Sequence, residues 1–138
     1  MRKRTRSREY ALQILYQIDI THEEPKSAID DFWQAHIEEG IDEEMKDFAA
    51  EIVKGAVQNL AEIDRKIAQY ATNWELERMA VVDRNIMRMG GFELLYSSGI
   101  PPKVAINEAV DLAKKFSGVE AGKFVNAILD KIKIELEK

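Results

Sequence analysis

Residues 45–60, MKDFAAEIVKGAVQNL, decide the fold class of this chain. Their apolar positions follow one another in alternating steps of three and one residues, which is the spacing of one stripe along an α-helix. The stripe consists of Met45, Phe48, Ala49, Ile52, Val53, Ala56, Val57 and Leu60. The pattern therefore predicts an amphipathic helix whose apolar face packs in a core.

Helical spacing continues on both sides of this stretch, without strand-like alternation, internal repeats or low-complexity linkers. With 138 residues, 46% of them hydrophobic, the chain suits one domain or two tightly fused sub-bundles. We predict an all-α, compact bundle of about seven helices. They are a first from Thr5 or Ser7 to Ile18, a second from near Ser27 to Gly40, the quoted third, a fourth through Tyr70, a fifth from Met79 to Ser97, a sixth starting at Pro101–Pro102 and a seventh after a loop at Ser117–Gly122.

Several helix ends carry local signals. Either Thr5 or Ser7 offers a hydroxyl to cap the first helix. Asn59 with Glu62 three residues later resembles a capping box that opens the fourth helix. Gly40 suits a left-handed helix end, and Gly90–Gly91 suggests close approach of a neighbouring backbone rather than a ligand site.

The fifth predicted helix is apolar nearly all round, which is typical of a helix in the middle of a bundle. Asp83 and Glu93 fall within its apolar faces, where an unpaired carboxylate is costly, so each needs a partner or access to solvent. The local candidates for pairing are Arg78, Arg84 and Arg88. Alternatively, an exposed Asp83–Arg84 pair would present a surface for docking another protein.

The net charge of −5 conceals an asymmetric distribution. Residues 1–8 carry +5 and residues 9–138 carry −10, with twelve acidic residues between Asp19 and Glu51. We expect residues 1–8 to form a basic N-terminal arm that attracts a polyanion such as nucleic acid, although such runs also occur as solubilising tails. The cations of this arm are Arg2, Lys3, Arg4, Arg6 and Arg8.

Composition and motifs argue against several functional classes. The chain has no cysteine, and its two histidines, His22 and His36, lack a metal-binding spacing. No common catalytic signature is present, and no stretch approaches the ~20 apolar residues of a membrane span. We therefore expect a non-enzymatic, cytoplasmic protein that uses no metal or cofactor and has no membrane anchor.

Tyr16 is misplaced for a core residue. At 100° per residue it lies about 150° from the apolar stripe of its helix and shares the opposite face with Arg6, Glu9 and Gln13. Cations beside an amide and an exposed ring are typical of single-stranded RNA recognition. The alternative is that Tyr16 packs against the second helix.

A second candidate surface flanks the predicted loop at Ser117–Gly122. Phe116 and Phe124 lie about 70° and 100° from the apolar stripes of their helices, so both rings are candidates for partial exposure. With Lys114, Lys115 and Lys123 nearby, they would form a basic, aromatic patch that stacks bases and contacts phosphates. The alternative is that one or both rings fill the junction between two helices.

Four segments together resemble the NusB family of bacterial transcription antitermination factors. They are REYALQILY at 8–16, RMAVVDRNIMR at 78–88 continuing to Leu94, IPPKVAINEAVDLAK at 100–114 and KFVNAILD at 123–130. The resemblance implies a NusB-type helical bundle. It also implies binding to boxA-type single-stranded RNA of ribosomal RNA leader transcripts, together with the ribosomal small-subunit protein NusE, in an antitermination complex on RNA polymerase.

Site residues follow from the same resemblance, position by position. Asp83 and Arg84 match the region that the family uses toward its ribosomal-protein partner. Self-association remains open, as do two alternative functions: a protein-binding helical scaffold with an acidic interface, and an accessory RNA-binding module of ribosomal RNA modification. The RNA surface that the resemblance implies comprises Arg6, Arg8, Gln13, Tyr16, Phe116, Glu120, Lys123 and Phe124. The basic arm adds Arg2, Lys3 and Arg4 to this surface.

Overall fold

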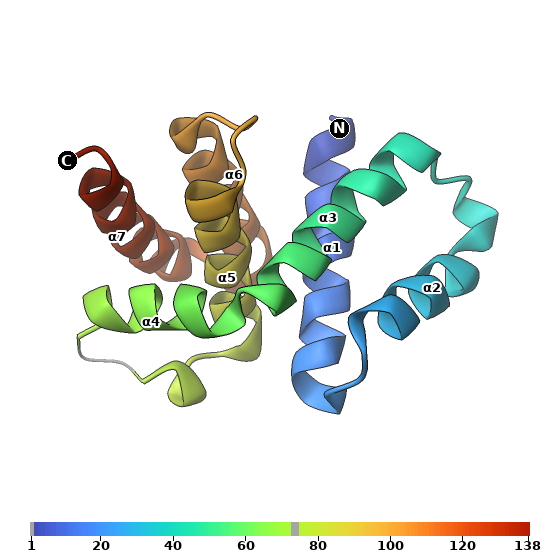
Figure 1. Cartoon of the computed structure of the whole chain (residues 1–138), viewed down its shortest axis with the longest axis horizontal. Coiled ribbons are helices and arrows are strands. Elements are labelled where there is room, and N and C mark those ends of the chain that lie inside the picture. The colour runs from blue at the N-terminus through green and yellow to red at the C-terminus, as the bar shows by residue number, and fades with distance from the viewer. Residues whose placement is uncertain (1, 73–74) are drawn as a thin grey trace. The chain divides into compact units, whose positions relative to one another are not determined.

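The computed structural model describes residues 2–72 and 75–138. In these residues it contains seven α-helices, two short 3-10 helices and no strand, which confirms the all-helical prediction (Figure 1). None of these helices is both long and apolar enough to cross a membrane. The chain divides into two compact units, Met1–Gln58 and Asn59–Lys138.

Three α-helices and one 3-10 helix build the first unit. The core forms where α1 packs against α2 and α3, and where α2 packs against α3 (Figure 1). On α1 the predicted stripe is confirmed at Ala11, Ile14 and Leu15, which are all buried, whereas Ile18 is half-buried. The elements are α1 (Lys3–Thr21), α2 (Pro25–Ala35), η1 (Ile37–Glu39) and α3 (Glu43–Gln58).

The quoted stretch forms α3 as predicted. Its stripe is buried at Met45, Ala49, Ile52, Val53 and Ala56, while Phe48 and Val57 are half-buried. The helix ends at Gln58, so Leu60 belongs to the next helix and not to this one. A strict helical spacing was therefore sufficient to locate both the helix and its buried face.

Several helix ends in the first unit differ from the predicted ones. The first helix begins earlier than the predicted Thr5 or Ser7, because α1 starts at Lys3 and includes most of the basic run at residues 1–8. Neither hydroxyl caps it: Arg2 is the N-cap residue, and α1 has no side-chain cap. At the other end α1 continues to Thr21, where His22 adopts the left-handed conformation.

The second helix also differs from its predicted bounds. It begins at Pro25, because proline fits the first helical position, where no backbone N–H is needed. It ends at Ala35, and the 3-10 helix η1 carries the chain on to Gly40. Gly40 has a φ of 63°, which confirms its left-handed conformation.

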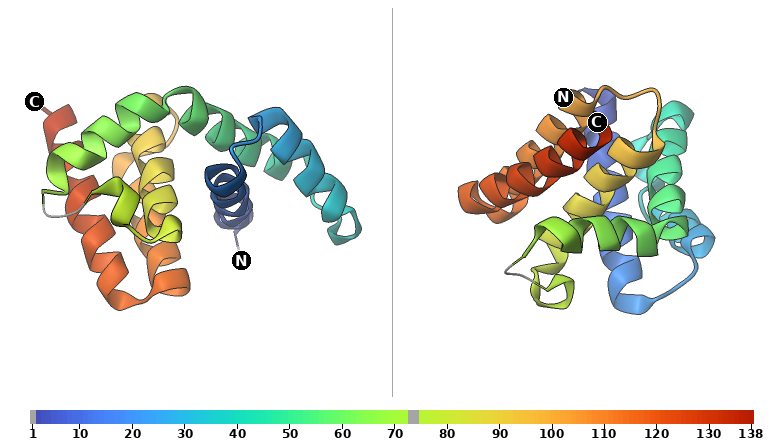
Figure 2. Two further views of the ribbon diagram at one scale, coloured as in Figure 1. Left: turned by 90° about the horizontal axis from the view of Figure 1, so that it is seen from below. Right: turned by 60° about the vertical axis from the view of Figure 1, so that its left-hand side comes forward.

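The second unit surrounds one central helix. This helix, α5, packs against α4, α6 and α7, and α6 packs along α7 (Figure 2). Its side chains Ile86, Met87, Met89 and Phe92 are all buried, as an apolar pattern on every side predicted. The elements are α4 (Leu60–Tyr70), η2 (Leu76–Arg78), α5 (Val81–Tyr96), α6 (Pro102–Ser117) and α7 (Val119–Leu136).

The glycine pair of α5 permits close packing. A Cβ atom on Gly90 would lie 2.6 Å from Cδ1 of Leu129, and one on Gly91 would lie 3.0 Å from Cγ2 of Ile63. Both distances are shorter than ordinary van der Waals contact. The interpretation of this pair as a packing feature is therefore confirmed, but side chains and not a neighbouring backbone approach the two glycines.

Polar ties join the helices of the second unit. Arg88 binds Asp64 through two hydrogen bonds, Nε to Oδ1 at 2.9 Å and Nη2 to Oδ2 at 3.0 Å. On α7, Glu135 accepts hydrogen bonds from Lys66 and, at 2.7 Å, from the Tyr70 hydroxyl. These bonds connect α4 to both α5 and α7.

Two predictions about this unit are wrong. Asn59 makes no side-chain capping bond to α4, and Glu62 binds Arg65 on its own helix at 2.6 Å instead. The loop predicted at Ser117–Gly122 is reduced to Gly118, because α7 already begins at Val119. Gly118 has a φ of 105°, a conformation open to glycine, and it turns the chain in a single residue.

Candidate nucleic-acid interface

Several basic residues lie together at the N-terminal end of α1. Lys3, Arg4 and Arg6 occupy three of its first four positions, no acidic residue lies in its first turn, and the exposed Arg2 precedes it. A cation at a helix N-terminus opposes the positive end of the helix dipole, at a cost of about 0.3–1 kcal/mol each. The same arrangement adds the partial charges of the free backbone N–H groups to those of the side chains. This end of α1 is therefore destabilised by its own charges and favours an anion.

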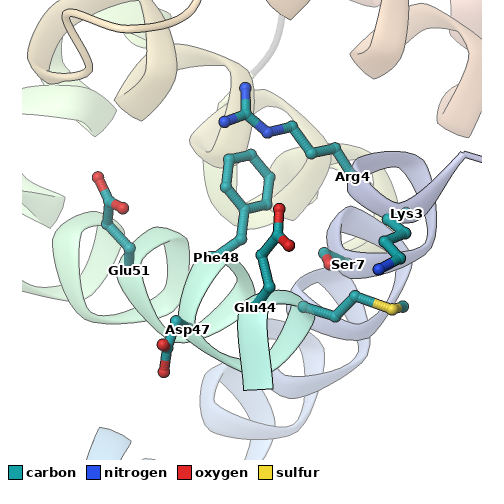
Figure 3. A pocket seen from close by; sticks show the side chains of 8 residues that line it. Lys3, Arg4, Ser7, Glu44, Asp47, Phe48 and Glu51 are labelled. Atoms are coloured by element: carbon teal, nitrogen blue, oxygen red, sulfur yellow. The ribbon is translucent and has the colours of Figure 1, made fainter. Parts of the chain in front are cut away.

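A cavity of about 200 Å³ lies beside these cations within the first unit (Figure 3). The Arg4 side chain reaches over the Phe48 ring, with its guanidinium carbon 4.8 Å from the ring centre. The α3 wall of the cavity carries the carboxylates of Glu44, Asp47 and Glu51. Arg4 therefore contacts the Phe48 ring in a cavity that acidic side chains also line.

Lys3 has a closer partner. Its Nζ lies 2.9 Å from Oδ2 of Asp42, and both side chains are substantially exposed. The hydrogen bond to Asp42 raises the pKa of Lys3, and the same bond, followed by that from the Met45 backbone N–H, lowers the pKa of Asp42. A phosphate would have to compete with this carboxylate for Lys3.

Arg8 is placed differently from the rest of the predicted basic set. It is only 2% exposed, and its guanidinium carbon lies 5.1 Å from the centre of the Phe48 ring. The reason is helical geometry: Arg8 precedes Ala11 and Leu15 by three and seven residues, which puts it on the buried face. The expectation that Arg8 is displayed with the other cations is therefore corrected.

The face of α1 predicted from Tyr16 is open to solvent. Tyr16 is 40% exposed, Arg6 and Gln13 are exposed, and Glu9 is half-buried. The Gln13 amide contacts its own helix, with Nε2 3.4 Å from the Glu9 carbonyl oxygen. Tyr16 is therefore a surface residue and not a core residue, as its position on the helix predicted. Arg6, Gln13 and Tyr16 present a cation, an amide and a ring on one helix face.

Tyr10 holds the Arg6 side chain, a contact that the sequence analysis did not identify. Arg6 Nη2 donates to the Tyr10 hydroxyl oxygen at 2.9 Å, and the Tyr10 hydroxyl donates to Oε1 of Glu39 at 3.2 Å. The spacing of four residues between Arg6 and Tyr10 was the available signal, since it places them one turn apart. The acidic partner on η1 had no signal in the sequence.

The turn between α6 and α7 displays the second candidate surface. Phe116 is 46% exposed, and Nζ of Lys115 lies 5.4 Å from its ring centre. Val119, which the sequence analysis did not single out, is 60% exposed on the other side of Gly118. The alternative of a ring buried between helices is therefore excluded for Phe116.

The remaining predicted residues of this surface lie along the first turns of α7. Lys123 is exposed and contacts Glu120, with Nζ 3.3 Å from Oε1. Phe124 is half-buried, so its ring is neither fully exposed nor fully buried in the junction between two helices. A Cβ atom on Gly122 would lie 2.8 Å from Cγ of Lys114, so glycine allows α6 and α7 to approach closely here.

The two carboxylates of α5 differ in their surroundings. Glu93 is buried and has an interaction partner. Asp83 is half-buried, and its Oδ1 has no hydrogen-bond partner among residues 2–72 and 75–138. Neighbouring Arg84 donates from Nη1 to the Leu76 carbonyl oxygen at 3.1 Å, while Arg88 binds Asp64. The start of α5 therefore contains a buried carboxylate oxygen that has no hydrogen-bond partner among the described residues.

The histidines have local structural contacts. His22 caps α1, and Nδ1 of His36 lies 2.8 Å from the Phe32 carbonyl oxygen. Across the described ranges, no group of three acidic or histidine side chains is arranged to hold a metal ion.

Comparison with known proteins assigns the chain to a family. The family model that matches it is that of the NusB family, over residues 5–133. The chain belongs to the NusB family. A transcription antitermination protein NusB from Anaeromyxobacter dehalogenans is 45% identical over 130 residues, which cover 94% of this chain and 89% of that protein.

Solved NusB structures share the fold. NusB of T. maritima matches with a TM-score of 0.86 and 35% identity, covering 96% of this chain and 91% of that one. A crystal structure of the antitermination factors NusB and NusE with double-stranded RNA matches with a TM-score of 0.86 and 31% identity, covering 98% of each chain. These comparisons confirm the predicted family and its bundle fold, and membership of NusB indicates a regulatory protein and not an enzyme.

Proposed function

We propose that this NusB-family chain acts in transcription antitermination by binding boxA-type RNA of ribosomal RNA leader transcripts. The observation that carries the proposal is the exposed face of α1, where Gln13 lies about two turns after Arg6 and Tyr16 lies one turn after Gln13. This face combines what single-stranded RNA binding requires: a cation for phosphates, an amide for base edges and a ring for stacking. The near full-length similarity to antitermination proteins supports the same conclusion.

Arg2, Lys3 and Arg4 would supply affinity rather than discrimination. They add charge beside the positive end of the α1 dipole, which attracts any phosphate backbone. Arg8 would act indirectly, since it is buried against Phe48 and supports the helix that carries the others.

The α6–α7 turn would contribute a second stacking surface. Phe116 is exposed beside Lys115 at the end of α6, and Glu120 and Lys123 lie on the first turns of α7. Exposed apolar side chains this close to lysines suit an unpaired base whose phosphate is nearby. Phe124, being half-buried, would offer the edge of its ring.

Partners would include a ribosomal small-subunit protein, NusE, within the antitermination complex on RNA polymerase. The similar solved structure that holds NusB together with NusE supports this partnership. We infer that Asp83 and Arg84 contribute to the contact, because they match the region that the family uses toward its ribosomal-protein partner and both side chains are partly exposed at the start of α5. Since bacterial transcription takes place in the cytoplasm, we infer a cytoplasmic location.

RNA titration with and without NusE tests the function. Labelled boxA-type RNA is added to the parent, Tyr16→Ala and Phe124→Ala, and a duplex of the same sequence is measured in parallel, because the similar NusB–NusE structure contains double-stranded RNA. Loss of a stacking ring should weaken binding of the single strand by about 5- to 100-fold. Tyr96→Ala is the matched control, since Tyr96 is 43% exposed and lies outside both candidate surfaces.

The outcomes separate the alternatives. We expect NusE to strengthen binding and the single strand to bind more tightly than the duplex. Unchanged affinity in both Tyr16→Ala and Phe124→Ala would contradict the site assignment. Binding of NusE without any RNA affinity would favour a protein-binding scaffold.

A further inference from the structure

Tyr10 connects an exposed cation of α1 to a carboxylate on η1. Its hydroxyl oxygen accepts a hydrogen bond from Nη2 of Arg6 at 2.9 Å, and its hydroxyl donates to Oε1 of Glu39 at 3.2 Å. The Arg6 guanidinium also lies over the Tyr10 ring, with its carbon 5.8 Å from the ring centre. Arg6 is thereby held by a ring and a hydroxyl together, while its side chain remains exposed.

Aromatic side chains of α2 and its C-terminal cap fix the Tyr10 ring. The ring centre lies 5.8 Å from those of Phe32 and Trp33 and 6.3 Å from that of His36, all in edge-to-face arrangements. Tyr10 itself is buried. These contacts and the burial of the ring hold the Tyr10 side chain in place, which fixes the position of its hydroxyl oxygen.

The hydroxyl can serve both neighbours only while it keeps its proton. Burial raises the pKa of Tyr10, and the charge of Arg6 acts in the opposite direction with a smaller effect. The phenol is therefore neutral at physiological pH. The neutral hydroxyl donates a hydrogen bond to the Glu39 carboxylate and accepts one from Arg6 at the same time.

An arginine that is already ordered loses less entropy when it binds a phosphate. A guanidinium has five N–H donors, so the bond to Tyr10 leaves others for a ligand. Ordering a long side chain at an interface ordinarily reduces affinity by several-fold. At Arg6 most of this ordering precedes binding.

We propose that Tyr10 is a positioning residue for RNA: its hydroxyl, held by Glu39, fixes the Arg6 guanidinium in the orientation that receives an RNA phosphate. This inference rests on the proposed function, since it requires Arg6 to contact RNA. The positioning role belongs to the Tyr10 hydroxyl group alone, because the Tyr10 ring has a separate role in the core.

A double-mutant cycle tests the inference. Tyr10→Phe retains the ring and removes the hydroxyl, and Arg6→Gln removes the cation. Labelled single-stranded boxA-type RNA is titrated with the parent, each single variant and the double variant at several salt concentrations. We expect Tyr10→Phe to weaken binding about three- to tenfold with the salt slope unchanged. Arg6→Gln should weaken it at least as much and reduce the slope by about 0.7.

The double variant decides whether Tyr10 acts through Arg6. If it does, the double variant binds no more weakly than Arg6→Gln alone, because the hydroxyl has nothing left to position. Tyr70→Phe is the matched control, since the Tyr70 hydroxyl donates to Glu135 at 2.7 Å in the second unit. Its RNA affinity should equal that of the parent, and thermal unfolding of every variant checks that the fold is retained.

Each contrary result has a separate meaning. If Tyr10→Phe binds like the parent while Arg6→Gln is weakened, the positioning role is overturned and the proposed function stands. Strictly additive losses would also overturn it, since Tyr10 would then act without Arg6. If Arg6→Gln binds RNA like the parent, both the positioning role and the proposed use of this α1 face fail.

Discussion

The guanidinium of Arg8 lies over the ring of Phe48, 5.1 Å from its centre, and is almost completely buried. Arg6, two residues earlier, is exposed. Helical geometry thus separates two arginines of one basic run into a structural residue and a surface residue.

Substitution should distinguish these two roles. Arg8→Ala removes a buried side chain and its ring contact, so we expect the free energy of unfolding to fall by about 2–3 kcal/mol. Arg6→Gln should change it by less than about 1 kcal/mol while weakening RNA binding. Urea unfolding followed by circular dichroism measures both. Equal stability of Arg8→Ala and the parent would contradict the structural role.

Gly90 should tolerate no larger side chain. A Cβ there would lie 2.6 Å from Cδ1 of Leu129, which is itself fully buried. We expect Gly90→Val to lower the free energy of unfolding by about 2–3 kcal/mol. Gly99→Val is the control, because no atom lies within 4 Å of a Cβ built on Gly99. Similar losses in both variants would mean that close packing at Gly90 is not the cause.

Ser7 offers a route to higher stability. The residue is 1% exposed, and its Oγ has no hydrogen-bond partner in the described part of the chain. Ser7→Ala removes this buried hydroxyl and improves helix propensity, so the free energy of unfolding should rise by about 0.5–2 kcal/mol. Thermal and urea unfolding measure the change. A loss of stability would show that the hydroxyl has a stabilising partner.

Glu135 should contribute to acid sensitivity. Hydrogen bonds from Lys66 and then Tyr70 lower the pKa of Glu135 below its ordinary 4.5. A carboxylate whose pKa is lower in the folded than in the unfolded state stabilises the fold above the unfolded value. That stability is lost as pH falls through the folded value. Glu135→Gln should therefore be less stable than the parent at pH 7, with the difference shrinking below about pH 4.5.

A comparison variant makes the pH experiment specific. In Glu62→Gln the lost partner is Arg65, three residues away on the same exposed helix face. Such local exposed pairs contribute little, so this variant should differ less from the parent at pH 7. If the difference in the free energy of unfolding between Glu135→Gln and the parent stays constant from pH 7 to pH 3, the result contradicts the role given to the ionised carboxylate.

Sequence patterns were sufficient to predict structural features that depend on the residues of a single helix. The strict spacing of α3 located its buried face, and projection of α1 identified Tyr16 as an exposed ring. The apolar surroundings of Gly90 indicated close packing in the same way. These features depend on residues within one helix and on the general need to bury apolar surface.

Features that depend on another element could not be predicted. Arg8 was grouped with its charged neighbours, and its burial became visible only with Phe48 of α3 in place. The Arg6–Tyr10–Glu39 chain joins residues 29 positions apart, and no local pattern identifies the acidic partner. The turn at Gly118 was predicted too long because polar and small residues resemble a loop even where helix continues.

Salt dependence of RNA binding tests the central claim most directly. Labelled boxA-type single-stranded RNA is titrated at several salt concentrations with the parent, with an α1 variant in which Arg2, Arg4 and Arg6 become Gln, and with a charge-matched control in which the exposed Lys103, Lys131 and Lys138 become Gln. Neutralising about four to six phosphates predicts a log–log slope of about −3 to −4 for the parent. The slope of the α1 variant should be less negative than that of the parent by about 2, and its RNA affinity should be much weaker. The control should keep the slope and the affinity of the parent. An α1 variant that retains the parent's slope and affinity, or a control that loses as much, would contradict RNA binding through the exposed face of α1.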